Sequence, residues 1–155
     1  MRWLKILIII LIIYGIFGHQ QFYASSAKQT NQNLNEIRRV QSFLQKYNSP
    51  LKENAKDFVE AGEKYHLDYR LLPTVACVES SCGKNYKLNP FGWASDTVSY
   101  GSTTENIFAI ASRINSLSYY KTYKKTKDLR DFAKAYNGKF AEDYYRKLIY
   151  FYNQL

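Results

Sequence analysis

Apolar side chains recur three and four residues apart along most of the chain, and this pattern predicts a mainly helical fold. In residues 28–48, which are otherwise polar, the apolar positions at this spacing are Leu34, Ile37, Val40, Leu44 and Tyr47. They predict an amphipathic helix, which the stretch Asn48-Ser49-Pro50 should end. Strand signals are few, and comparable patterns predict helices over residues 51–65, 73–80, 102–117, 126–135 and 141–155. We therefore expect a mainly α domain, with α+β character at most.

The helix predicted to begin near Pro73 carries one carboxylate on its apolar face. Leu72, Val75, Ala76 and Glu79 occupy positions i, i+3, i+4 and i+7, so Glu79 shares the apolar stripe. Burial raises the pKa of a carboxyl group and yields a proton donor at working pH, which a glycoside hydrolase requires of its general acid. The alternative is a glutamate near a helix C-terminus that faces water or pairs with a basic side chain.

The segment after this helix predicts an ordered loop. Residues 84–96 are rich in turn formers and aromatic side chains, and a short hairpin could extend to Tyr100. Ser102 and Glu105 have the spacing of a capping box at the start of the next helix. We therefore interpret Glu105 as a structural cap rather than a catalyst.

The N-terminus has the features of an export signal. Arg2 and Lys5 flank the start of an apolar run of about a dozen residues from Ile6 to Phe17, shorter than the roughly 20 residues of a full membrane span. Residues 1–27 are thus expected to be a signal peptide, with a cleavage site after Ala27, or a membrane anchor if they stay attached. Residues 28–50 would form an amphipathic spacer helix and residues 51–155 the main domain. We expect the protein outside the cytoplasm, at the membrane, in the wall or secreted.

The chain is strongly basic, with a net charge of +9 at pH 7. A positive surface favours polyanions such as nucleic acid, acidic lipid headgroups or anionic cell-wall polymers. No compact basic and aromatic repeat is present, so nucleic acid is not an expected partner.

Cys77 and Cys82 are the two cysteines of the chain, and export would allow them to form a disulfide. Residues five apart on one helix point about 140° away from each other, so pairing requires the helix to end near Ser80 or Ser81. Gly83 makes such an end reasonable. The alternative is two small buried thiols.

Several kinds of chemistry lack the residues they need. The two histidines, His19 and His66, are far apart, and no zinc-type cluster or glycine-rich phosphate loop exists. We expect neither a metal nor a cofactor. Carboxylate chemistry beside aromatic side chains remains, and this combination is typical of enzymes that cleave carbohydrates.

Three stretches together resemble a known superfamily. They are residues 71–81 (LLPTVACVESS), Gly83-Lys84 and Asn89-Pro90-Phe91-Gly92-Trp93. The combination resembles the lysozyme-like superfamily, and within it the endo-β-N-acetylglucosaminidase-like hydrolases of the bacterial wall. Residues 100–114 resemble the family's next segment, and residues 135–138 (AYNG) are similar to a motif of the lytic transglycosylases. The resemblance spans residues 54–153 and implies a lysozyme-like helical domain with a small loop or hairpin lobe.

The resemblance also implies roles for single residues. Glu79 would be the general acid that protonates a β-1,4 linkage between amino sugars, and Ser80 would orient it or cap the helix end. Gly92 would let the backbone approach the glycan closely, and Tyr136 would bond the carboxyl or an N-acetyl group. The implied substrate-binding residues are Ser80, Asn89, Phe91, Gly92, Trp93, Tyr136 and Asn137. For Phe91, Trp93 and Tyr136, packing in the core is the competing interpretation.

The sequence does not identify a second catalytic carboxylate. Asp96 is the best-placed candidate and Glu105 is the next. Without a partner, the substrate's own N-acetyl or 6-hydroxyl group would complete the reaction, and the latter gives anhydro products. The expected function is an exported peptidoglycan glycosidase of N-acetylglucosaminidase type, acting on glycan strands. A lytic transglycosylase and an inactive glycan-binding module are the alternatives.

Overall fold

The structure is a computed structural model that describes residues 28–155, except for the side chain of Asp96. The signal or anchor expected over residues 1–27 lies outside the described residues. None of the helices in residues 28–155 has the length and apolar character that a membrane crossing requires.

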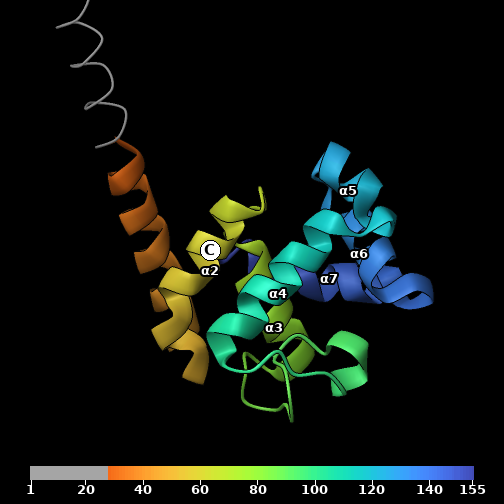
Figure 1. Ribbon diagram of the computed structural model, residues 1–155, viewed down its shortest axis with the longest axis horizontal. Coiled ribbons are helices and arrows are strands. Elements are labelled where there is room, and N and C mark those ends of the chain that lie inside the picture. The colour runs from red at the N-terminus through yellow and green to blue at the C-terminus, as the bar shows by residue number, and fades with distance from the viewer. Residues whose placement is uncertain (1–27) are drawn as a thin grey trace, which may run out of the picture. The chain divides into compact units, whose positions relative to one another are not determined.

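The described residues form helices joined by turns (Figure 1). Residues 28–46 are helical, and six α-helices follow in the rest of the described chain. They are α2 (Ala55–Lys64), α3 (Leu71–Ser80), α4 (Thr103–Ser116), α5 (Lys121–Thr126), α6 (Leu129–Asn137) and α7 (Ala141–Tyr152). Short 3₁₀ turns lie at Pro50–Asn54, Trp93–Asp96, Ser118–Tyr120 and Gly138–Phe140. The expectation of a mainly helical domain is therefore confirmed.

The hairpin expected to extend to Tyr100 is wrong, because no strand occurs in residues 28–155. Gly92, Ala94 and Ser95 all have positive φ angles, which fold the backbone into tight turns rather than extended segments. The side chain of Asn89 also donates to the carbonyl of Val98 at 2.7 Å, so an amide rather than a strand ladder joins the two sides of the loop.

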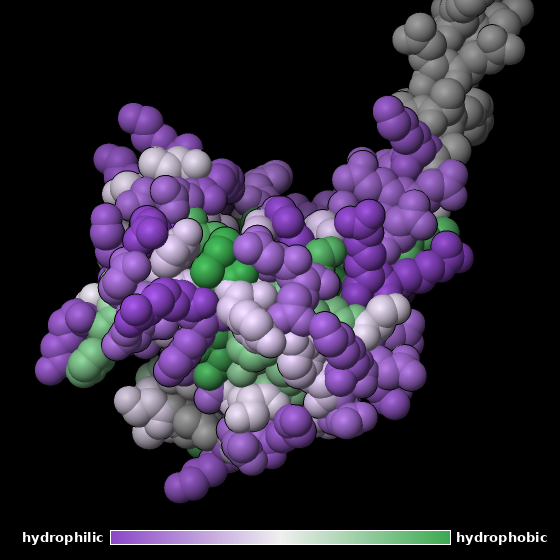
Figure 2. All heavy atoms as spheres, turned by 180° about the vertical axis from the view of Figure 1, so that it is seen from behind, coloured by the Kyte–Doolittle hydropathy of each residue, from purple (hydrophilic) through white to green (hydrophobic). Residues whose placement is uncertain are grey.

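Helix α3 forms the centre of the core. Eight of its ten residues are buried, and it packs against α2 and α7. Burying a leucine such as Leu71 or Leu72 contributes roughly 1.5–3 kcal/mol to stability. Helix α4 packs against α2, and α5, α6 and α7 pack in sequence beside each other (Figure 1). On the face opposite to that view, hydrophilic side chains cover most of the surface (Figure 2).

The segment predicted as a spacer contributes its second half to this core. Val40, Phe43 and Leu44 are buried in the same cluster as α3. The ring of Phe43 packs edge-on against Tyr47, and the Tyr47 hydroxyl donates to Gln154 Oε1 at 2.6 Å. Residues 36–155 accordingly form one compact unit, which starts before the boundary expected at residue 51.

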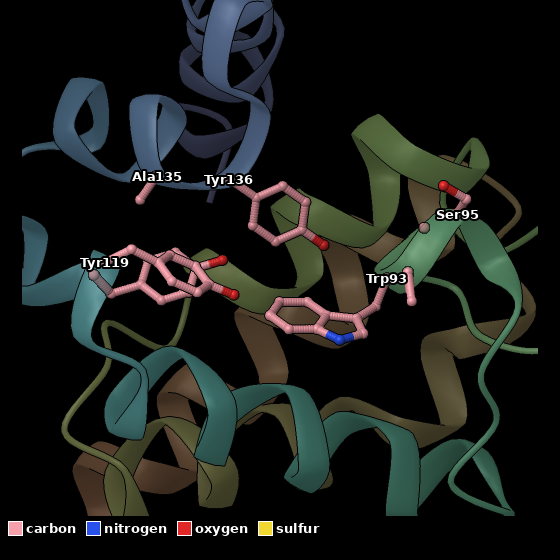
Figure 3. A pocket seen from close by; sticks show the side chains of 8 residues that line it. Trp93, Ser95, Tyr119, Ala135 and Tyr136 are labelled. Carbon is pink, nitrogen blue, oxygen red and sulfur yellow. The ribbon is translucent and has the colours of Figure 1, made fainter.

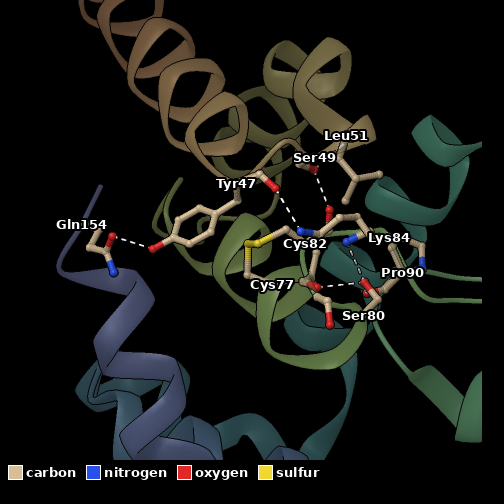
Figure 4. The surroundings of a disulfide bond; sticks show 12 residues. Tyr47, Ser49, Leu51, Cys77, Ser80, Cys82, Lys84, Pro90 and Gln154 are labelled. Atoms are coloured by element: carbon tan, nitrogen blue, oxygen red, sulfur yellow. Dashed lines mark hydrogen bonds between the residues drawn. A yellow bond between two sulfur atoms is a disulfide. The ribbon is translucent and has the colours of Figure 1, made fainter.

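The turn after α3 is held at several points. The helix ends at Ser80, and Ser81 and Cys82 have left-handed φ angles of 52° and 59°. This end allows a disulfide between Cys77 and Cys82 (Figure 4). The Ser49 hydroxyl donates to the carbonyl of Cys82 at 2.6 Å, which joins the turn to the end of the first helix.

The sequence predicted the start of α4 correctly but did not predict α5. The predicted capping box is confirmed, because Ser102 and Glu105 each bond to the other's backbone N–H. Helix α5 was not predicted. Its sequence KTYKKT holds a single buried side chain, Tyr123, and one apolar residue cannot make a helical stripe.

Replacing Gly83 tests how tightly this turn is packed. Its φ is +76°, and a Cβ would lie 2.5 Å from Leu51 Cγ. We expect Gly83→Ala to lower the free energy of unfolding by at least about 2 kcal/mol, through backbone strain and overpacking. Urea unfolding measures the change. Because Leu51→Ala removes the clashing atoms, the double variant should lose less stability than the sum of the single variants; simple additivity would contradict the proposed contact.

Candidate active site

Glu79 lies in the last turn of α3, where it is partly buried. Burial raises the pKa of its carboxyl group above the usual value, while Tyr144 and the positive charge of Lys147 partly oppose this shift. Both of these residues come from α7. The carboxyl group is therefore protonated to a higher pH than an exposed glutamate, as a proton donor needs to be.

The loop backbone at Gly92 lies directly against this carboxyl group. A Cβ at Gly92 would come within 2.4 Å of Glu79 Oε2, and the φ angle of +60° also favours glycine. Any other residue would displace the carboxyl group. The close contact at Gly92 in the structure is with Glu79, and the approach to a glycan that was expected there stays a prediction.

Asn89 and Ser80 hold the loop in place. Asn89 is fully buried, accepts from the N–H groups of Phe91 and Trp93 at 3.2 and 3.0 Å, and donates to the carbonyl of Trp93 at 3.2 Å. The Ser80 hydroxyl lies 2.8 Å from the Ala76 carbonyl oxygen and 2.7 Å from that of Pro90. These contacts fit the capping role expected for Ser80, while a substrate contact by either residue stays a prediction.

The two aromatic residues of the loop have different surroundings. Phe91 is fully buried and packs edge-on against Phe58 in the core, with the ring centroids 6.4 Å apart. Its carbonyl oxygen accepts a hydrogen bond from the Tyr136 hydroxyl. Trp93 is partly exposed and packs edge-on against Tyr136 at 6.0 Å. Core packing accounts for the Phe91 ring, whereas Trp93 is open to a ligand.

Trp93 and Tyr136 line a hollow of about 570 Å³ (Figure 3). Its other lining residues are Gly92, Ala94, Ser95, Tyr119, Tyr120 and Ala135. The volume is in the roughly 300–1,000 Å³ range of ligand sites, and aromatic faces are suited to packing against flat apolar surfaces. Gly92 lines this hollow and also lies against Glu79, so it connects the two.

The second carboxylate is not found among the described side chains. The side chain of Asp96 lies outside the described residues. Glu105 is exposed and serves as the helix cap, and its bonds to Ser102 lower the pKa of its carboxyl group. None of the described groups that shift the pKa of Glu79 is a carboxylate. Asn137, the last residue of α6, is partly buried.

Tyr144 is a site residue that the sequence analysis did not single out. Its ring stacks on Tyr136 with centroids 5.4 Å apart, and its buried hydroxyl lies beside the Glu79 carboxyl group without full hydrogen-bond geometry to any group in residues 28–155. Burial raises the pKa of Tyr144, so the phenol stays protonated beside Glu79. Tyr144 and Lys147 are three residues apart, a spacing that places both on one face of α7 and that could have indicated a shared environment.

No group of three or more potential metal ligands occurs in the described part of the chain. A comparison of the sequence with protein-family models found no match. A comparison with curated proteins also found no match.

The raised pKa of Glu79 predicts a pH-dependent effect on stability. Because the folded state holds this proton more tightly than the unfolded state, stability falls as pH rises from the unfolded pKa through the folded one. Glu79→Gln removes this loss. We expect the variant to melt at a higher temperature than wild type at pH 7 and to show no such gain near pH 3. Equal melting temperatures at both pH values would contradict a buried, shifted carboxyl group.

Proposed function

We propose that this protein is an exported peptidoglycan glycosidase in which Glu79 is the general acid. The enzyme would cleave a β-1,4 linkage between amino sugars, with a lysozyme-like arrangement of its helices. The observation that carries the proposal is the position of Gly92, which lines the aromatic hollow on one side and lies against the carboxyl group of Glu79 on the other. A glycan bound in the hollow would therefore lie near the carboxyl group of Glu79, which can donate a proton.

The residues present match the needs of glycosidic bond cleavage. The leaving oxygen must receive a proton, and a positioned acid with a raised pKa contributes typically 10²–10⁴-fold to the rate. Trp93 and Tyr119 offer aromatic surfaces on which sugar rings can pack, and Tyr119 is 52% exposed. Tyr144 on α7 carries a protonated phenol beside Glu79, and this phenol would stabilise the carboxylate after proton transfer.

A single-acid reaction, of which anhydro-forming chemistry is one form, is the second candidate, and the surroundings of Glu79 favour it. No described carboxylate acts on Glu79, whereas a two-acid glycosidase places a second one roughly 5–9.5 Å away. A single acid would use the substrate's 6-hydroxyl or N-acetyl group in place of the second carboxylate. The cleaved strand would end in an anhydro sugar in the first case and, after hydrolysis, in a reducing end in the second.

The location proposed for the protein rests on the leader. The apolar run from Ile6 to Phe17 favours export, and a disulfide such as Cys77–Cys82 is compatible with an oxidising compartment. The net charge of +9 favours retention at an anionic wall.

Loss of the acid should abolish cleavage. In zymography on purified peptidoglycan, we expect clearing by wild type and at least about a hundredfold less by Glu79→Gln, since a general acid contributes typically 10²–10⁴-fold. Glu60→Gln, an exposed position on α2, is the matched control and should clear like wild type. Equal clearing by wild type and Glu79→Gln would overturn the role of Glu79. Binding of glycan strands by both proteins without any product would indicate a glycan-binding module.

The mass of the product separates the two chemistries. An anhydro end is one water lighter than a reducing end, so mass spectrometry of digested strands distinguishes them directly. Because no described carboxylate shifts the pKa of Glu79, we expect Asp96→Asn to leave the rate unchanged. Anhydro ends would then identify the substrate's 6-hydroxyl as the attacking group, and reducing ends its N-acetyl group. Reducing ends together with a large loss of rate in Asp96→Asn would identify Asp96 as the second carboxylate.

The charge of Lys147 should set the upper pH limit of activity. Its positive charge lowers the pKa of Glu79, so Lys147→Gln should raise that pKa and move the alkaline limb of the pH–rate profile to higher pH. The shift should shrink as ionic strength rises, because Lys147 is exposed. Lys125→Gln on α5 removes the same charge and should leave the limb in place. A shift of the limb toward lower pH in Lys147→Gln would contradict the assignment.

A further inference from the structure

A second hollow, of about 370 Å³, shares no lining residue with the aromatic one. It lies between the helix that ends at residue 46 and the last residues of the chain. Arg38, Arg39, Ser42 and Lys46 line it from the helix, and Gln154 and Leu155 line it from the C-terminal side. The proposed cleavage of glycans uses none of these residues.

The basic side chains of this hollow form no ion pair within the described chain, and they outnumber the one carboxylate among its lining residues, the α-carboxylate of Leu155. Arg39, Ser42 and Lys46 follow a spacing of three and four residues, and Arg38 is four residues before Ser42, so all four are neighbours on the helix surface. No ion pair within residues 28–155 involves Arg38, Arg39 or Lys46. Other arginines of the described chain, those at positions 70, 130 and 146, do pair with carboxylates. Like charges held together repel, and an anion would relieve this repulsion.

One wall of the hollow is fixed in place by hydrogen bonds. Lys46 Nζ donates to Gln154 Oε1 at 2.8 Å, and the Tyr47 hydroxyl donates to the same oxygen at 2.6 Å (Figure 4 shows the second bond). Gln154 Nε2 in turn donates to the carbonyl of Tyr150 at 3.2 Å. The ammonium group of Lys46 is thereby positioned before any ligand arrives, and such preorganisation lowers the cost of binding.

From this arrangement we propose that the hollow binds a phosphodiester group of a polyol-phosphate polymer. Two guanidinium groups present planar sets of N–H donors that match phosphate oxygens, and the Ser42 hydroxyl adds another donor. A volume of about 370 Å³ leaves room for carbon groups on both sides of a phosphate, and Phe43 supplies an apolar wall for them. The hollow has room for one phosphodiester group. A polymer carries many such groups, so another is close by whenever one dissociates, and the apparent affinity for the polymer rises.

Binding by the full chain in a neutral detergent tests the site. Isothermal titration calorimetry with poly(glycerol phosphate) should show binding by wild type, and Arg38→Gln combined with Arg39→Gln should weaken it at least about tenfold, the effect of losing one charge-assisted hydrogen bond. The matched control combines Lys121→Gln and Lys125→Gln, two exposed lysines on α5 that remove the same charge. This control should bind within about twofold of wild type. Equal weakening in both double variants would overturn the site, since binding would then follow net charge alone.

Three further arms identify the ligand. Glycerophosphoglycerol, a soluble phosphodiester, should compete with the polymer, whereas inorganic phosphate at the same concentration should compete less. Equal competition by inorganic phosphate would reduce the site to a simple anion site and overturn the assignment. The protein could instead float with phosphatidylglycerol vesicles in a way that depends on Arg38 and Arg39, without binding either soluble phosphodiester. That result would identify a membrane surface as the ligand and overturn the polymer assignment. All arms are repeated with Glu79→Gln, so the result does not depend on cleavage of glycans.

Discussion

The contact between the end of α3 and the loop at residues 89–93 is the constraint on which the candidate site depends. Ser80 closes the last turn of the helix and lies against the Pro90 carbonyl, and Gly92 places its backbone against the carboxyl group of Glu79. Because Gly92 has no Cβ, the loop comes close enough to shield part of the carboxyl group from water, and the pKa of Glu79 rises. The disulfide and the bond from Ser49 to Cys82 fix the turn on the other side. This confinement keeps the Glu79 carboxyl group protonated to a higher pH than that of an exposed glutamate.

Aromatic rings from three separate segments connect this buried group to the open hollow. Trp93 from the loop packs against Tyr136 from α6, and Tyr136 stacks on Tyr144 from α7. The Tyr136 hydroxyl also donates to the carbonyl of Phe91, which ties α6 to the loop. The wall of the hollow and the surroundings of Glu79 are thus one packed unit. A ligand that moves Trp93 would therefore also change the packing around the carboxyl group.

The local features of the fold could be predicted and the loop could not. The helical periods, the end of α3 near Ser80 and the capping box at Ser102 each depend on residues within a few positions of one another. The predicted hairpin failed because Asn89 bonds across the loop and several residues take positive φ angles, features that turn-forming composition alone does not reveal. The spacer was predicted as a separate element because its apolar stripe does not indicate what covers it; Val40 and Leu44 turn out to be buried in the core.

The sequence by itself determined that Glu79 lies on an apolar helical stripe, that the helix stops soon after it, and that a loop with Gly92 and Trp93 follows. These properties repeat with the helical period or are encoded in adjacent residues. Only the tertiary structure decided that Gly92 lies against Glu79, that Tyr144 and Lys147 adjust its pKa, and that Asn89 is buried beneath the loop. Tyr136 and Phe91 are 45 residues apart in sequence, and their contact arises from the packing of whole helices. No local pattern specifies that packing, because it depends on how all the apolar faces fill one core.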